Sequence, residues 1–130
     1  MRVNWVDTDA SGRIHYTAAL RYFEVAEHAL MRALFDGGGG PSDREFHLPR
    51  VHVECDYRAV LGYPDEFDCS ARIAAVGRSS LSYGFRATRA SDGALCLEGR
   101  IVAVAVGPDG QSMPLPDGAR AVFEAARSEA

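Results

Sequence analysis

Two carboxylates one residue apart, Asp7 and Asp9, are the residues of this sequence best placed to do chemistry. They occur in the stretch NWVDTDASGRIHY, residues 4–16, where Gly12 and His15 follow within a few positions. Aspartates at this spacing can accept hydrogen bonds from nearby amides, bind a metal ion, or act as a catalytic base or nucleophile. The neighbouring residues indicate which of these three interpretations fits best.

A turn is the simplest interpretation of the polar stretch. Asp7, Asp9 and Ser11 would accept local amide hydrogen bonds, and Gly12 would supply a positive φ. A calcium site has less support, although D-x-D-x-S-G resembles the start of a calcium-binding loop. The twelfth ligand of such a loop is Glu, but that position is Ala18 here, so we expect no metal ion.

Catalysis is the third interpretation, and it depends on the element that follows the loop. Apolar residues recur at spacings of three and four from Ala18 to Phe35, which predicts an amphipathic helix with Thr17 as its N-cap. Amides at a helix N-terminus favour negative charge, so a carboxylate in the preceding loop can activate a nucleophile while the helix end stabilises an oxyanion. Such a site needs only Asp9 and one backbone N–H a few residues further on.

The rest of the chain predicts an α+β fold. Residues 2–6 alternate and predict a short first strand, and the glycine run at 36–40 should end the long helix. Four β-rich runs then follow, and short connections containing Gly or Asp between the last three favour antiparallel hairpins; the runs are 49–60, 66–76, 80–90 and 94–106. A short helix is predicted within residues 114–130.

One long helix can cover only one face of this predicted five-stranded antiparallel sheet. We therefore expect the helix on one face and further protein on the other, with the apolar run IVAVAV, residues 101–106, in a central strand. A second copy of the chain, docked through the sheet edge or the second face, would complete the burial.

The composition and motifs of the sequence exclude several classes of function. The 130 residues predict a single domain, 1–130, and the net charge of −4 argues against affinity for nucleic acid or an anionic membrane. Three cysteines without C-x-x-C spacing indicate reduced thiols. No signal sequence or membrane-length apolar run occurs, so we expect a cytoplasmic protein. No G-x-S-x-G motif supports a serine hydrolase.

The segment VDTDASGRIHYTAALRYFEVAEHAL, residues 6–30, resembles the N-terminal signature of hotdog-fold acyl-CoA thioesterases of the 4-hydroxybenzoyl-CoA thioesterase type. That signature is D-x-D-x-x-G, two apolar residues, an aromatic pair and an aromatic-rich helix. The resemblance continues, as pattern, through residues 49–69, 76–93 and 99–106. It implies a long central helix wrapped by a curved five-stranded antiparallel sheet, and hydrolysis of an acyl thioester to a free acid and a thiol.

The resemblance also implies roles for particular residues. The family's catalytic carboxylate falls on Asp9, the backbone N–H that polarises the thioester carbonyl falls on Tyr16, and Gly12 matches the glycine that passes close to substrate. No cofactor is implied, because coenzyme A is part of the substrate. A homodimer or homotetramer is expected.

Other positions bear on the substrate. The turn that often carries basic residues for coenzyme A phosphates is reduced to Arg78, Ser79 and Ser80. Ala18 and Ala19 stand where relatives commonly have Asn and Tyr, which changes the acyl pocket and leaves both coenzyme A and an acyl-carrier protein open as the thiol carrier. Tyr63, before a proline, is a further candidate for lining a pocket.

Two rival functions remain open. His15 beside Asp9 would suit a hotdog hydratase or dehydratase of acyl thioesters, whose chemistry commonly uses a histidine with a carboxylate. A non-catalytic module that binds acyl thioesters is the other rival. Glu24 and Glu27 lie on the predicted helix, where a second hotdog thioesterase type carries its carboxylate, but with Asp9 present we expect them to be solvated or structural.

Overall fold

The predicted elements form in the expected order, with one exception at the N-terminus. The computed structural model describes residues 1–35 and 46–128. Its elements are the 3-10 turn η1 (Trp5–Asp7), α1 (Ala18–Leu34), β1 (Arg50–Tyr57), β2 (Phe67–Val76), β3 (Ser80–Arg89), β4 (Leu95–Val104) and α2 (Asp117–Ala126). The glycine run predicted to end the long helix lies outside the described residues.

The four strands form one antiparallel sheet in the order β1-β4-β3-β2. The two predicted hairpins are confirmed, since β2 pairs with β3 and β3 with β4. The strand that carries most of the apolar run is central, as predicted, because β4 lies between β1 and β3. One side of β1 and one side of β2 therefore remain at the edges of the described sheet.

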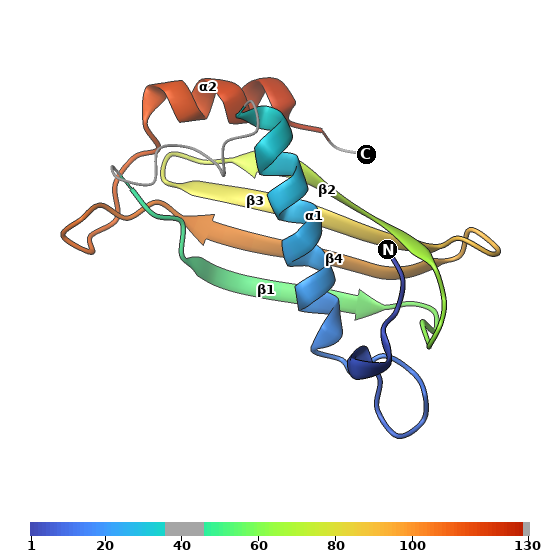
Figure 1. Ribbon diagram of the computed structural model, residues 1–130. Helices are drawn as coiled ribbons and strands as arrows, with labels where there is room; N and C mark the ends of the chain where they lie inside the picture. The colour runs from blue at the N-terminus through green and yellow to red at the C-terminus, as the bar shows by residue number, and fades with distance from the viewer. Residues whose placement is uncertain (36–45, 129–130) are drawn as a thin grey trace.

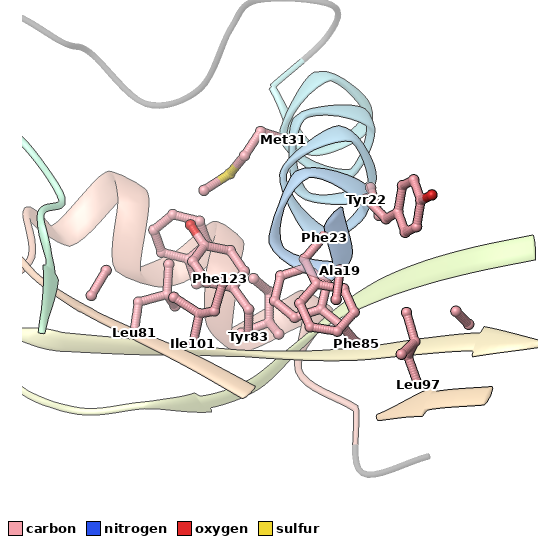
Figure 2. Close-up of a cluster of buried hydrophobic side chains, with 14 of the residues drawn as sticks. Ala19, Tyr22, Phe23, Met31, Leu81, Tyr83, Phe85, Leu97, Ile101 and Phe123 are labelled. Carbon is pink, nitrogen blue, oxygen red and sulfur yellow. The ribbon is translucent and has the colours of Figure 1, made fainter. Parts of the chain in front are cut away.

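Helix α1 lies across one face of the sheet, and α2 lies near its C-terminal end (Figure 1). The Phe23 ring stacks on Phe85 of β3 with centroids 4.6 Å apart, and Figure 2 shows the two rings in contact beneath α1. Gly99 of β4 makes this approach possible, since a Cβ there would lie 2.3 Å from Cε2 of Phe23. Phe35 and Phe123 join α1 to α2 with centroids 5.7 Å apart. These contacts fix the middle and the C-terminal end of α1 against the sheet and α2.

The predicted first strand is wrong. Residues 2–6 form only an isolated bridge between Arg2 and Glu66, and the chain then curls into η1. The described sheet therefore has four strands rather than five. The physical reason lies in Asp7: its backbone N–H donates to the Asn4 carbonyl at 2.9 Å, and its carboxylate accepts the Asn4 N–H at 2.9 Å. This local turn prevails over a short alternating pattern.

The second face of the sheet carries charged side chains from β1, β3 and β4, and the further protein expected to cover this face stays a prediction. Arg86 and Arg58 both pair with Glu98, at 3.3 and 3.1 Å, and Arg100 pairs with Glu54 at 3.6 Å. The uncovered apolar surface lies instead on the α1 side of edge strand β1, where Val51 is 60% exposed. Along β1, the apolar side chains of the α1 side alternate with charged side chains of the second face.

All three cysteines are free thiols, as predicted. Burial raises the pKa of Cys69 to about 11, and it raises the pKa values of Cys55 and Cys96 as well. These are features of structural rather than reactive cysteines. Among the described helices, neither has the length and apolarity needed to cross a membrane.

Candidate active site

The polar stretch between η1 and α1 forms a closed turn. Thr8 bridges Ile14 in antiparallel fashion, and the Asp9 N–H donates to the Arg13 carbonyl at 2.9 Å. The Gly12 N–H donates to the Asp9 carbonyl at 3.1 Å, and Gly12 has a φ of 81°. A residue with a Cβ would be strained at that φ, so glycine is required there. The local hydrogen bonding predicted for a turn is present.

The Asp9 carboxylate uses one of its oxygens within this turn. Its Oδ1 accepts the Ser11 backbone N–H at 2.8 Å and the Ser11 hydroxyl at 2.5 Å. Among the described residues, Oδ2 has no hydrogen-bond partner and the side chain is exposed. The two bonds from Ser11 hold the pKa of Asp9 below its usual range, so the group is ionised at neutral pH. It is therefore an oriented carboxylate with a free oxygen.

The start of α1 offers an unpaired backbone donor. Within the described part of the chain, the Tyr16 N–H makes no hydrogen bond, whereas the Ala18 N–H donates to the His15 carbonyl at 2.9 Å. Tyr16 lies at the N-terminal end of a 17-residue helix, where the aligned peptide dipoles favour an anion. Its ring is 69% exposed, so the backbone, not the ring, is the chemically useful part.

The predicted N-cap does not form. Thr17 has helical backbone angles, with φ −73° and ψ −18°, and its hydroxyl makes no capping bond. Its Oγ1 lies 2.8 Å from Nδ1 of His15 instead, so the hydroxyl is engaged by the imidazole. The His15 ring stacks on the Tyr16 ring with centroids 4.8 Å apart. Consequently, no side-chain hydroxyl caps the backbone N–H groups in the first turn of α1.

Asp7, unlike Asp9, is buried and fully engaged. Only 4% of it is exposed, and its carboxylate accepts hydrogen bonds from the Tyr22 hydroxyl at 2.9 Å and from the Arg21 guanidinium. Burial alone would raise its pKa, but the hydrogen bonds from the Asn4 amide, Tyr22 and Arg21 outweigh burial and lower it. The two aspartates of the D-x-D pair therefore have different environments and different chemistry.

A second loop, between β1 and β2, packs against the Asp9 turn. The Ile14 N–H donates to the Leu61 carbonyl at 2.9 Å, and the Tyr63 N–H donates to the Gly12 carbonyl at 3.0 Å. The Tyr57 hydroxyl donates to the Tyr16 carbonyl at 2.5 Å. Sequence reasoning missed Tyr57 as part of this site, because its partner is 41 residues away and no local pattern indicates the contact.

A surface cavity of about 270 Å³ opens between these loops. Its lining is mostly apolar, with two arginines and one tyrosine: Arg13, Ile14, Tyr57, Arg58, Ala59, Val60, Leu61 and Leu97. Arg58 is paired with Glu98 and Asp56, whereas Arg13 forms no ion pair with any described residue. Arg13 and Ile14 are the residues of the segment between Asp9 and Tyr16 that line this cavity.

The predicted substrate-binding residues do not all meet. Gly12 and Tyr63 lie in the paired loops, and Ala19 is fully buried in the first turn of α1. The turn 78–80 lies at the other end of the sheet, where Ser80 pairs with Val104. The Asp9 loop packs beyond the opposite end, where Tyr57 pairs with Leu97. The seven residue-to-residue steps from Leu97 to Val104 along β4 span roughly 23 Å. A single chain therefore does not bring the predicted phosphate-binding turn to Asp9.

The remaining carboxylates on α1 also differ from each other. Glu24 is exposed, whereas Glu27 is only 5% exposed and pairs with Arg50 at the start of β1. Glu27 is therefore structural, one of the two roles expected for it. Among the described residues, no group of three or more His, Cys, Asp or Glu side chains is arranged to bind a metal ion.

Comparison with known proteins identifies the family. The model of the Thioesterase-like superfamily matches residues 3–123, nearly the whole chain. The chain belongs to this superfamily. The match includes the Asp9 turn, the start of α1 and all four strands of the described sheet.

Individual proteins that are similar to this chain agree with this assignment. A protein of Aquifex aeolicus (strain VF5) named "Putative esterase" is 25% identical over 84 residues, which are 65% of this chain and 66% of that protein, so the match spans slightly less than two thirds of its length. The solved structure of a thioesterase superfamily protein from Jannaschia sp. CCS1 is 28% identical, with a TM-score of 0.80 over 95% of this chain and 77% of that one.

A solved structure of lower sequence identity shows the fold. A 1,4-dihydroxy-2-naphthoyl-CoA thioesterase from Synechocystis superimposes with a TM-score of 0.82 over 95% of this chain and 91% of that one, at 19% identity. The α+β hotdog fold expected from the sequence resemblance is therefore confirmed, with four strands in the described sheet rather than five.

Proposed function

We propose that this protein is a thioesterase that hydrolyses an acyl thioester to a free carboxylic acid and a thiol. One observation carries the proposal: a carboxylate with a free oxygen, Asp9, and an unpaired helix-start amide, Tyr16, lie within eight residues of each other in the chain. Acyl transfer needs these two groups, one to deliver a nucleophile and one to stabilise an oxyanion. Superfamily membership supports thioester hydrolysis in general.

The chemistry can follow either of two routes. Asp9 attacks the thioester carbonyl to give a mixed anhydride that water then opens, or it accepts a proton from the water that attacks directly. In both routes the carbonyl oxygen becomes negative at the Tyr16 N–H, and the C–S bond breaks to release a thiolate. Because thiolate is a good leaving group, the site needs no strong general acid. His15 is placed beside Tyr16 and remains a candidate for orienting the acyl group.

The substrate is proposed to be an acyl-coenzyme A or an acyl-carrier-protein thioester, with no other cofactor, acting in the cytoplasm. The mostly apolar cavity beside Tyr57 and Leu61 is the space proposed here for the acyl group. The Synechocystis structure is that of a coenzyme A thioesterase, and this supports the same carrier class here.

A homo-oligomer is proposed to complete the site. Edge strand β1 has an unpaired side and an apolar surface beside α1, where Val51 is 60% and Val53 44% exposed. Antiparallel pairing of β1 with a second β1 would place the start of one strand beside the end of the other. The partner's 78–80 turn would then lie at the same end as Asp9, which one chain alone does not achieve.

A panel of acyl thioesters with chromogenic detection of released thiol tests the proposal. Aliphatic and aromatic acyl-coenzyme A compounds should be compared with the same acyl groups on a carrier protein. We expect thiol release with at least one class. Water addition to an enoyl thioester without thiol release would select the hydratase, and tight binding with no turnover would select the binding module.

A further inference from the structure

Asp7 connects three segments that meet at the candidate site. Its Oδ2 accepts the Asn4 N–H and the Tyr22 hydroxyl, both at 2.9 Å, and its Oδ1 accepts from the Arg21 guanidinium. Its backbone carbonyl accepts the His15 N–H at 2.7 Å. One residue thus ties together η1, the returning arm of the turn and the first turns of α1.

These connections lie next to both proposed catalytic groups. Asp9 follows Asp7 by two residues, and Tyr16 follows His15 directly. Arg21 and Tyr22 come from the same helix whose N-terminus carries the Tyr16 amide. Figure 2 shows the Tyr22 hydroxyl pointing away from the aromatic cluster under α1, so this residue reaches out from the core to hold the turn. Asp7 is therefore bonded to residues on both sides of the segment that carries Asp9 and Tyr16.

We propose that Asp7 is a positioning residue for thioester hydrolysis, which holds the Asp9 carboxylate and the Tyr16 amide in register through Arg21 and Tyr22. This inference rests on the proposed function. Asp7 itself touches no reacting atom in this arrangement. Its contribution is geometric, and a misplacement of about 1 Å between reacting groups can lower a rate about a hundredfold.

The role requires a carboxylate, because every group that reaches the Asp7 side chain is a donor: the Asn4 amide, the Tyr22 hydroxyl and the Arg21 guanidinium. An asparagine has the same shape, but its NH₂ group cannot accept. In Asp7→Asn at least one donor would therefore face another donor inside a nearly closed site. The turn would have to move to relieve the contact, and Asp9 would move with it.

The same helix contains a matched control. Glu27 is also a nearly buried carboxylate, 5% exposed compared with 4% for Asp7, and it also pairs with an arginine, Arg50. Within one chain its partner lies at the start of β1, at the opposite end of that strand from the Asp9 turn. Glu27→Gln therefore makes the same chemical change in a similar environment without touching either proposed catalytic group.

The experiment compares Asp7→Asn with Glu27→Gln by kcat, KM and Tm, all assayed on an acyl thioester that the wild type hydrolyses. We expect both substitutions to lower Tm. Asp7→Asn should lower kcat about tenfold to a hundredfold with KM changed less than about threefold, whereas Glu27→Gln should leave kcat within about twofold. Equal effects of the two substitutions on kcat, or a normal kcat in Asp7→Asn, would overturn the proposal.

A second pair of variants keeps the test valid if Asp7→Asn does not fold. The Arg21 side chain is 49% exposed, so its replacement should be tolerated. Arg21→Gln should lower kcat, and Arg21→Lys, which keeps a charged donor, should restore most of it; identical kcat values in both would count against positioning. Asp9→Asn separates the two claims. If that variant is inactive while Asp7→Asn is normal, only the positioning role fails. If the wild type releases no thiol from any thioester, both fail.

Discussion

The close approach of α1 to the sheet depends on Gly99, and replacing it by alanine gives a prediction that can be worked out from the structure. A Cβ at this position would lie 2.3 Å from Cε2 and 2.7 Å from Cζ of Phe23, and 3.0 Å from the Glu54 carbonyl oxygen. Carbon atoms in normal contact are about 3.5–4.0 Å apart, so the Phe23 ring must move by more than about 1 Å. The neighbouring Phe85 ring, with its centroid 4.6 Å away, leaves little room for that movement.

The expected cost of Gly99→Ala follows from two opposing effects. Overpacking of a core costs about 1–3 kcal/mol, while replacing glycine by alanine recovers about 0.4–1 kcal/mol of chain entropy in the unfolded state. The net loss should be about 1–2 kcal/mol in the free energy of unfolding. For a chain of this size that corresponds to a fall in Tm of roughly 3–10 °C.

Thermal and urea denaturation of Gly99→Ala measure this loss, and Gly118→Ala is the control. Gly118 lies exposed in α2, and a methyl group added there would meet no atom within 4 Å, so alanine should raise stability by about 0.5–1 kcal/mol. Adding Phe23→Leu should recover part of the loss in Gly99→Ala, because it removes the ring atoms that clash. A Gly99→Ala protein as stable as the wild type would refute the packing described here.

Three further predictions concern single groups. In the folded protein the pKa of Asp7 lies below its ordinary value of 3.8, so the unfolded chain binds this proton at a higher pH than the folded chain does. The ionised Asp7 therefore stabilises the fold fully above about pH 4, and this stabilisation is lost as the pH falls through the folded pKa. In an acid titration, Asp7→Asn should lose less folding stability than the wild type. With its pKa raised from 9.0 to about 11, Cys69 should react with a maleimide at pH 8 roughly a hundredfold more slowly than in denatured protein, and equal rates by mass spectrometry would contradict its burial. Tyr57→Phe removes the hydrogen bond to the Tyr16 carbonyl and should lower kcat by no more than about tenfold, whereas a complete loss of activity would show that Tyr57 has a direct role.

The elements that the sequence predicted well are those with a long periodic pattern. Helix α1 and strands β1 to β4 each extend over eight residues or more, so alternation or helical spacing could be recognised with little ambiguity. Residues 2–6 offered too short a pattern, and there the hydrogen bonds of Asp7 prevail. Trp5 and Val6, expected in a strand, are 69% and 85% exposed.

In the candidate site, too, local features could be predicted from the sequence and contacts between distant segments could not. Asp9 and an amide at the start of the next helix could be proposed from the sequence because they lie close together in the chain, and the family resemblance then pointed to Gly12 and Tyr16. Contacts made across long stretches of chain could not be proposed in this way: Tyr57 with Tyr16, or the loop at Leu61 with Ile14. The same limit applies to the turn 78–80, whose distance from Asp9 depends on strand order rather than on spacing.

The role proposed for Asp9 is tested best by measuring kcat/KM for Asp9→Asn in the thiol-release assay. Asparagine keeps an oxygen that can accept both hydrogen bonds from Ser11, so the turn should be retained and only the charge removed. An unchanged Tm would confirm that the fold is intact. We predict a loss of about a hundredfold or more in kcat/KM. Near-normal hydrolysis by Asp9→Asn would contradict the assignment of this carboxylate as the base or nucleophile.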